Sequence, residues 1–170
     1  MEFNPNDAFV YNNRGLAYLY SGDAKKAIAD YDMAIKLDPK YASAYYNRGN
    51  AYLDSDTDKA IVNCAQAIKL NASYSNAYNC RGNAYFNLKD TKKADYNMAI
   101  KSDPNSAEAY NNRGNTYAVL EDYKKAVVDY IKAISLKHDY AEAYANRGKD
   151  ARKACELGSC DLLQKIADIF

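Results

Sequence analysis

Residues 109–117 read AYNNRGNTY, and near-copies of this phrase recur along the whole chain. The copies are FVYNNRGLAY at 9–18, AYYNRGNAY at 44–52, AYNCRGNAY at 77–85 and AYANRGKDA at 143–151. Their Arg-Gly pairs lie 34, 33, 32 and 34 residues apart. A second phrase follows each of the first four copies, such as KKAIADYDMAIKLDP or KKAVVDYIKAISLKH. Self-similarity at a fixed period of this size predicts a repeat array.

Each repeat is predicted to be a pair of helices. Within a repeat, tyrosine stands at position 4, glycine at position 8 and, in four copies, tyrosine at position 11, so these residues share one helix face. A glycine inside a helix costs about 1 kcal/mol relative to alanine, so five such glycines indicate closely packed helices. Such a pair buries its apolar face only by stacking on its neighbours. Position 1 of the successive repeats is Ala8, Ala42, Ser75, Ala107 and Ala141.

The period, the Tyr-x-x-x-Gly-x-x-Tyr block, the later alanines and the closing Asp-Pro resemble the tetratricopeptide repeat family. The resemblance implies an all-α fold, a right-handed superhelical solenoid of antiparallel helix pairs. It implies a leader at 1–7, four repeats, and a partial fifth repeat with a C-terminal capping helix. The expected bounds of the repeats are 8–41, 42–74, 75–106 (shortened), 107–140 and 141–170.

The third repeat is two residues shorter than the first, which reads KKAIADYDMAI where the third reads KKADYNMAI. Two residues rotate a helix by about 200°, so a deletion inside the helix would displace its buried face. We therefore expect a shorter turn near Lys89 and Asp90, with Tyr96 and Ala99 kept inward. Lys92 then replaces a small residue, and we expect a loose fit there.

The fifth repeat passes from the start of a first helix to the end of a second one, and its turn is missing. We expect one continuous helix from about Ala141 to Leu157, ended by Gly158. Asp161 and Gln164 then predict a capping box for a last helix. That helix would be a lid on the end of the solenoid or a surface that pairs two chains.

The composition limits the partners and the compartment that we expect. Lysine plus arginine (23) balances aspartate plus glutamate (22), which gives no reason to expect nucleic acid or an anionic membrane as partner. No apolar run approaches the roughly 20 residues of a membrane span, and the N-terminus does not read as a secretory signal. Four cysteines without a Cys-x-x-Cys pair predict reduced thiols and favour the cytoplasm, unless a signal has been removed upstream.

No constellation of catalytic or cofactor-binding residues stands out. His138 is predicted to be a turn residue, and Cys64, where other repeats have tyrosine, a core residue. Cys155 and Cys160 have no partner histidines at zinc spacing. A glycine-rich phosphate loop is also missing. The sequence thus predicts a protein that is not an enzyme and that holds no cofactor and no metal.

The predicted functional surface is the other face of the first helices, at positions 2, 6, 9 and 13. In the family that the chain resembles, this face lines a concave groove that holds the ligand. Asparagine recurs there, and its amide suits the N–H and C=O groups of an extended peptide. The pattern resembles the asparagine ladder in the repeat arm of O-linked N-acetylglucosamine transferases. The predicted binding residues are Asn13, Asn47, Asn112 and Asn146 at position 6, Asn50, Asn83 and Asn115 at position 9, and Asn12, Asn79 and Asn111 at position 5.

Two alternatives remain for these positions. Asparagine at position 6 would also fit a partly structural role, and Cys80 interrupts the ladder. Arginine at position 7 is predicted to pair with aspartate of the second helix (Asp30, Asp95 or Asp129) rather than to read an anionic ligand. Capture of a C-terminal carboxylate by lysines is disfavoured, because Lys149 is the one basic residue at positions 5 and 9.

We therefore predict a scaffold that binds an extended peptide or a partner protein in its groove. One alternative is a structural module that assembles into a homo-oligomer through its C-terminal helix. The other is the substrate-recruiting arm of a larger enzyme.

Overall fold

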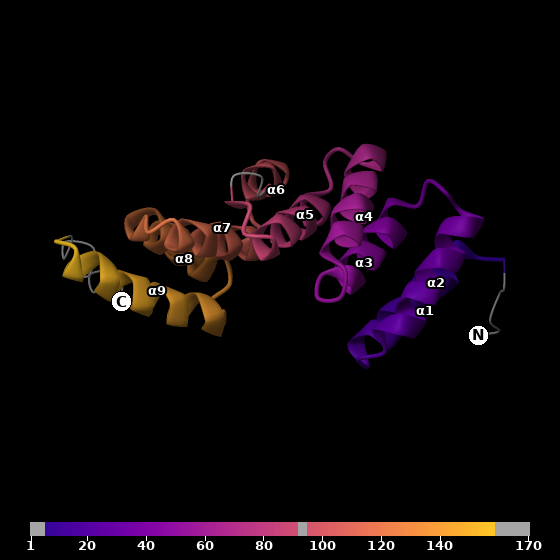
Figure 1. The fold of residues 1–170 in the computed structure, drawn as a ribbon, viewed down its shortest axis with the longest axis horizontal. Coiled ribbons are helices and arrows are strands. Elements are labelled where there is room, and N and C mark those ends of the chain that lie inside the picture. The colour runs from indigo at the N-terminus through magenta and orange to yellow at the C-terminus, as the bar shows by residue number, and fades with distance from the viewer. Residues whose placement is uncertain (1–5, 92–94, 159–170) are drawn as a thin grey trace. The chain divides into compact units, whose positions relative to one another are not determined.

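The computed structural model describes residues 6–91 and 95–158, and within these ranges the regular elements are helices and no strand occurs (Figure 1). The described chain divides into two compact units on either side of the bond between Asp95 and Tyr96. The first unit holds α1 (Ala8–Tyr20), α2 (Ala24–Leu37), α3 (Ala42–Tyr52), α4 (Thr57–Leu70) and α5 (Ser75–Asn87). The second holds α6 (Tyr96–Ser102), α7 (Ala107–Val119), α8 (Tyr123–Leu136) and α9 (Ala141–Glu156).

The first unit stacks two helix pairs and the helix α5, and the second stacks α6 and α9 on one helix pair. In the first unit α1 packs on α2 and α3 on α4, while α2 contacts α3 and α4 contacts α5. The first helices α1, α3 and α5 also contact one another in sequence order. In the second unit α7 pairs with α8, α6 contacts α7, and α9 packs on α8. The all-helical stacking predicted from the period is confirmed.

Aspartate begins the full-length second helices. Asp23, Asp56 and Asp122 are the N-caps of α2, α4 and α8, and each side chain accepts a hydrogen bond from the backbone N–H three residues on. Such a cap satisfies one of the backbone donors that a helix leaves unpaired at its start. The lysine at that third residue also forms an ion pair with the same carboxylate, which lowers the pKa of each aspartate.

The third repeat shortens at a different place from the one predicted. Its turn has the same hydrogen bonds as the turn of the first repeat: Asp90 N–H donates to the Tyr85 carbonyl as Asp23 N–H does to that of Tyr18. The prediction of a shorter turn near Lys89 and Asp90 is therefore wrong. The two residues are missing between Asp90 and Asp95 instead, where the first repeat has seven steps from Asp23 to Asp30 and the third has five. The described second helix of the third repeat is α6, of 7 residues.

The inward positions of this repeat are as predicted. Tyr96 and Ala99 are both buried, so the short helix keeps its core face. Lys92, at which we predicted a loose fit, lies outside the described residues.

The predicted continuous helix of the fifth repeat is confirmed. α9 runs from Ala141 to Glu156, and its backbone turns at Gly158, whose φ is +87°. Gly158 N–H donates to the Cys155 carbonyl, which closes the helix end. The predicted capping box at Asp161 and Gln164 lies outside the described residues.

Small residues let the paired helices approach closely, as predicted. The alanines at positions 20 and 27 are fully buried wherever their surroundings are described: Ala27, Ala34, Ala60, Ala67, Ala99, Ala126 and Ala133. In the first and fourth repeats the glycine at position 8 lies under the tyrosine ring at position 24. A Cβ added at Gly15 would lie 2.6 Å from Cε1 of Tyr31, and one at Gly114 would lie 2.6 Å from Cε1 of Tyr130. These contacts leave room for glycine only.

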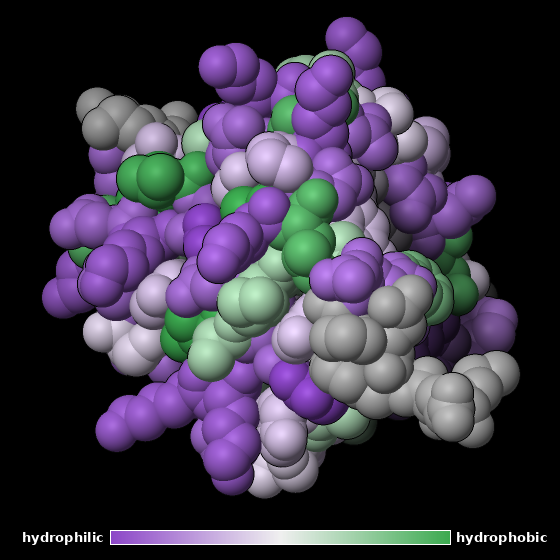
Figure 2. Space-filling model, turned by 90° about the vertical axis from the view of Figure 1, so that its right-hand side faces the viewer, coloured by the Kyte–Doolittle hydropathy of each residue, from purple (hydrophilic) through white to green (hydrophobic). Residues whose placement is uncertain are grey.

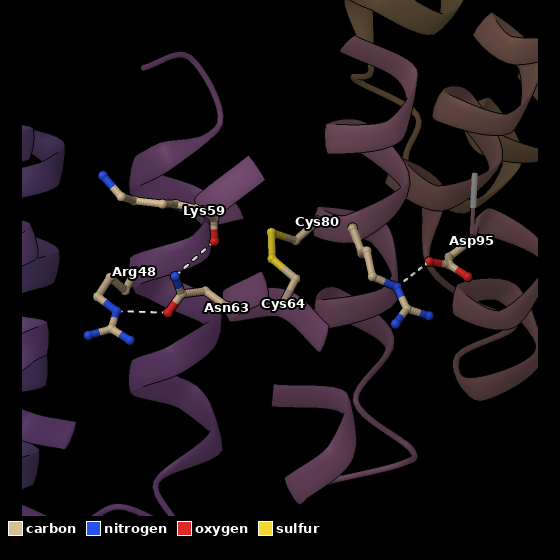
Figure 3. The surroundings of a disulfide bond; sticks show 7 residues. Arg48, Lys59, Asn63, Cys64, Cys80 and Asp95 are labelled. Atoms are coloured by element: carbon tan, nitrogen blue, oxygen red, sulfur yellow. Dashed lines mark hydrogen bonds and ion pairs between the residues drawn. A yellow bond between two sulfur atoms is a disulfide. The ribbon is translucent and has the colours of Figure 1, made fainter. Parts of the chain in front are cut away.

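The prediction of reduced thiols is wrong. Cys64 of α4 and Cys80 of α5 form a disulfide, with their Cα atoms 6.2 Å apart (Figure 3). Cys155 is disulfide-bonded as well. Cys64 is fully buried, so its prediction as a core residue is confirmed.

Candidate peptide-binding surface

The position-5 asparagines lie inside the stack. Asn12, Asn79 and Asn111 are all buried, with Asn111 fully so. Asn111 Nδ2 donates to Oε1 of Glu142 on α9 at 3.0 Å. Position 5 therefore faces the neighbouring repeat, and these three side chains are out of reach of a ligand in this structure.

Two of the position-6 asparagines link adjacent first helices. Asn47 is buried, and its Nδ2 donates to Oδ1 of Asn12 on the preceding first helix at 2.8 Å. Asn146 Nδ2 donates in the same direction, to Oδ1 of Asn115, at 3.0 Å. Asn13 is exposed and Asn112 is half-buried. The links fix the register of one first helix on the next.

The position-9 asparagines are more open. Asn50 is exposed, and Asn83 and Asn115 are half-buried. Asn115 also accepts a hydrogen bond from the hydroxyl of Tyr130 at 3.0 Å. The asparagine side chains with exposed surface thus form two sets, one in each unit. They are Asn13, Asn50 and Asn83 in the first unit and Asn112, Asn115 and Asn146 in the second.

Three of the position-7 arginines pair with the predicted aspartates of their own repeats. Arg14 forms a two-pronged pair with Asp30, at 2.7 and 2.6 Å, and Arg113 one with Asp129, at 2.7 Å for both bonds. Arg81 pairs with Asp95. The hydrogen bond to the carboxylate is the main cause that raises the pKa of each of these three guanidinium groups. They hold helices together and are engaged before any ligand arrives.

Two of the arginines also reach back to the preceding repeat. Arg48 Nη1 binds the carboxylate of Asp32 in α2, and Arg113 Nη1 donates to Oδ1 of Asn97 in α6 at 2.8 Å. In its own repeat Arg48 donates to Asn63, at 2.7 Å, in place of an aspartate. The arginine therefore connects the second helices of two successive repeats.

Large apolar side chains lie exposed at the rim of the predicted surface. Phe9 at position 2 and Tyr20 at position 13 are at the two ends of α1, and Tyr20 is 90% exposed. Val119, at position 13 of the fourth repeat, borders a cavity of about 340 Å³ with Lys149 and Lys153 on its wall. The asparagine pattern gave no weight to these residues, although positions 2 and 13 belong to the same helix face. Figure 2 shows one face of the molecule, where hydrophobic residues form small groups among polar ones.

Neither a metal site nor a membrane span is found in the described parts of the chain. No group of three or more His, Cys, Asp or Glu side chains within residues 6–91 and 95–158 could hold a metal ion. No helix described here is long and apolar enough to cross a bilayer. His138 is exposed in the turn between α8 and α9, where the sequence placed it.

Comparison with known proteins identifies the family. The sequence model described as TPR repeat matches residues 15–56, and the one described as tetratricopeptide repeat matches 107–140. A solved structure, the second TPR of Spaghetti (RPAP3) bound to the HSP90 peptide SRMEEVD, is 31% identical, with 57% of this chain and 93% of that chain covered and a TM-score of 0.55. This chain belongs to the tetratricopeptide repeat family. The predicted family and fold class are confirmed.

Other relatives extend the comparison. The crystal structure of MamA protein is 25% identical over 93% of this chain and 88% of that chain, with a TM-score of 0.73. Human serine/threonine-protein phosphatase 5 is 46% identical over 48 residues, which are 28% of this chain and 10% of that protein. The match thus spans about a tenth of that curated relative. Tetratricopeptide repeat proteins generally mediate protein–protein interactions, and such scaffolds are typically not catalytic.

Proposed function

We propose that this tetratricopeptide repeat chain binds an extended segment of a partner protein across its first helices. The observation that supports the proposal is the pair of amide links, Asn47 to Asn12 and Asn146 to Asn115. They hold neighbouring first helices in register, so that exposed asparagines recur on one face. Binding groups held in place before the ligand arrives lose less conformational entropy on binding.

The exposed asparagines supply the contacts in this proposal. In the first unit Asn13 and Asn50 are exposed on successive first helices. A carboxamide can donate to a peptide C=O and accept from a peptide N–H, so it binds the backbone with little regard to sequence. The exposed Phe9 and Tyr20 would add apolar contact with a partner's side chains. The buried Asn12, Asn47, Asn79 and Asn111 would support the surface from beneath.

The test uses a peptide selected from a display library against the full chain. Replacing Asn13 and Asn50 together by alanine is expected to weaken its binding at least tenfold, which is about 1.4 kcal/mol. The control is Asn105→Ala in the turn after α6, which is exposed but lies off the first helices. Equal affinity in the double variant and the control contradicts the asparagine contacts.

Self-association is a second candidate, favoured by the apolar end of the second unit. Leu120 and Leu157 are exposed and line a cavity of about 350 Å³ beside the end of α9. Light scattering over a concentration series tests it. A discrete oligomer that Leu157→Asp dissociates supports it, and a monomer at high concentration contradicts it.

The similarity to a serine/threonine-protein phosphatase also fits the alternative that this chain is the substrate-recruiting arm of a larger enzyme. In that case the same surface would hold the substrate of a larger enzyme, and the full-length gene product would carry a catalytic domain.

A further inference from the structure

The joint between the second and third repeats differs from the other joints that the structure describes in full. The disulfide of Cys64 and Cys80 crosses it from α4 to α5, as Figure 3 shows. Cys64 occupies position 24 of the second repeat and Cys80 position 6 of the third. Both side chains are buried.

Other joints have tyrosine and asparagine at these two positions. Tyr31 is followed by Asn47, and Tyr130 by Asn146. Both tyrosines are almost fully buried, each over the glycine of its own repeat. A buried tyrosine removes about 150–250 Å² of surface from water, and a cysteine is far smaller. The two replacements occur together, so this joint has exchanged ring packing for a covalent bond.

The contact of the position-7 arginine with the second helix of its own repeat is also weaker in the second repeat. Arg14 and Arg113 each hold the carboxylate of their own second helix through two hydrogen bonds. Arg48 instead donates a hydrogen bond to the neutral Asn63, and its ion pair goes back to Asp32 of the first repeat. Asn63 carries no charge, so it lacks the opposite charge and the bidentate geometry that an aspartate offers a guanidinium group. At this point the contact between α3 and α4 is therefore weaker than that between α1 and α2, and the disulfide is a covalent link from α4 to the next repeat.

We propose that the Cys64–Cys80 disulfide is a redox-dependent staple, and that its reduction makes the α4–α5 interface the first place where the first unit opens. A dithiol reductant supplies two electrons: its thiolate attacks one sulfur, and its second thiol closes the reductant's own disulfide. Cys64 and Cys80 are each left as a thiol. Neither thiol fills the volume of a tyrosine ring, so the reduced interface lacks both the bond and the packing. Stability in a repeat array is close to a sum of nearest-neighbour terms, so one weakened interface becomes a point of local opening.

The test measures amide hydrogen exchange of the full chain with and without dithiothreitol, in the absence of any peptide. Reduction is expected to speed exchange at least tenfold in α4 and α5 and to leave α1 and α2 unchanged. Dithiothreitol also reduces the disulfide of Cys155. Because Cys155 lies in α9 of the second unit, the effect of that reduction is measured separately, as hydrogen exchange in α9.

The matched variant is Cys64→Tyr with Cys80→Asn, which restores the residue pair of the other joints. Gly49 lies next to Cys64, as Gly15 lies next to Tyr31, and it is kept in this variant. The new tyrosine ring therefore packs over a glycine, as the ring of Tyr31 does. In this variant α4 and α5 should exchange alike with and without reductant. If it does not fold, Cys64→Ala with Cys80→Ala should exchange as fast as the reduced wild type under both conditions.

Two results would overturn the proposal. One is equal exchange in α4 and α5 of the oxidised and reduced wild type. The other is a peptide map of the untreated chain in which Cys64 and Cys80 are thiols. Weaker peptide binding after reduction would also follow, because α3 and α5 both carry asparagines of the surface, but that consequence rests on the proposed function. Since hydrogen exchange needs no peptide, the staple and the function fail independently.

Discussion

Two glycine-to-alanine changes in the second unit should shift stability in opposite directions. A Cβ added at Gly114 would lie 2.6, 2.9 and 3.1 Å from Cε1, Cδ1 and Cζ of Tyr130. Tyr130 is fully enclosed, and its hydroxyl contacts Asn115 and Asp150, so the ring has no open space to move into. At Gly148, in the middle of α9, no described atom lies within 4 Å of the added Cβ.

The magnitudes follow from packing and helix propensity. Forcing a methyl group into a filled core costs about 1–3 kcal/mol, and contacts this short place Gly114→Ala in the upper half of that range. Alanine returns about 1 kcal/mol of helix propensity at either site. Gly114→Ala should therefore lose about 1–2 kcal/mol of unfolding free energy, and Gly148→Ala should gain about 1 kcal/mol.

Urea unfolding followed by circular dichroism measures both variants against the wild type. The midpoint should fall for Gly114→Ala and rise for Gly148→Ala, with the m-value unchanged. Equal midpoints for the two variants, or a rise for Gly114→Ala, would refute the close packing of glycine under tyrosine.

Three further predictions test single contacts. Glu121 turns the chain between α7 and α8 at φ 59°, where glycine carries no Cβ penalty, so Glu121→Gly should raise the unfolding free energy by about 0.5–1 kcal/mol in urea titrations. Asp129→Ala leaves the guanidinium of Arg113 without its main partner and should cost about 2–3 kcal/mol; a loss below about 0.5 kcal/mol would show that the pair is not structural. Burial raises the pKa of Asp150, against smaller opposing effects of the hydrogen bond from Tyr130 and the charge of Lys149. The folded state therefore holds this proton more tightly than the unfolded state, and stability is lost as pH rises from about 4 through the folded pKa. Asp150→Asn should leave Tm unchanged at pH 3 and raise it at pH 7, and an equal Tm difference at both values would contradict this.

Helices, their pairing and the continuous α9 could be predicted from the sequence because they follow from local spacing. The glycine at position 8 and the tyrosine at position 24 recur in register, and their contact needs only two helices of one repeat. The position-7 arginines were predictable for the same reason, since their aspartates lie on the paired helix.

The asparagines were harder, because the spacing within one helix does not show which side the next repeat covers. Positions 5 and 6 both turn away from the paired helix, yet Asn12 and Asn47 are covered by contact between neighbouring first helices. The disulfide was missed for the same reason. The available signal was that Cys64 and Cys80 depart from the pattern at two positions that face each other across a joint.

The arginine that reaches back across a joint changes what counts as one unit of this protein. Arg48 contacts Asp32, and Arg113 contacts Asn97, each in the preceding repeat. If the chain is divided into repeats at position 1, each of these arginines is separated from that acceptor. Grafting one 34-residue copy into another array would transplant the arginine without that acceptor. A cassette that begins with a second helix and ends with the following first helix carries this contact whole. It divides the pairs of Arg14 with Asp30 and of Arg113 with Asp129 instead, so neither way of cutting keeps every arginine contact inside one cassette.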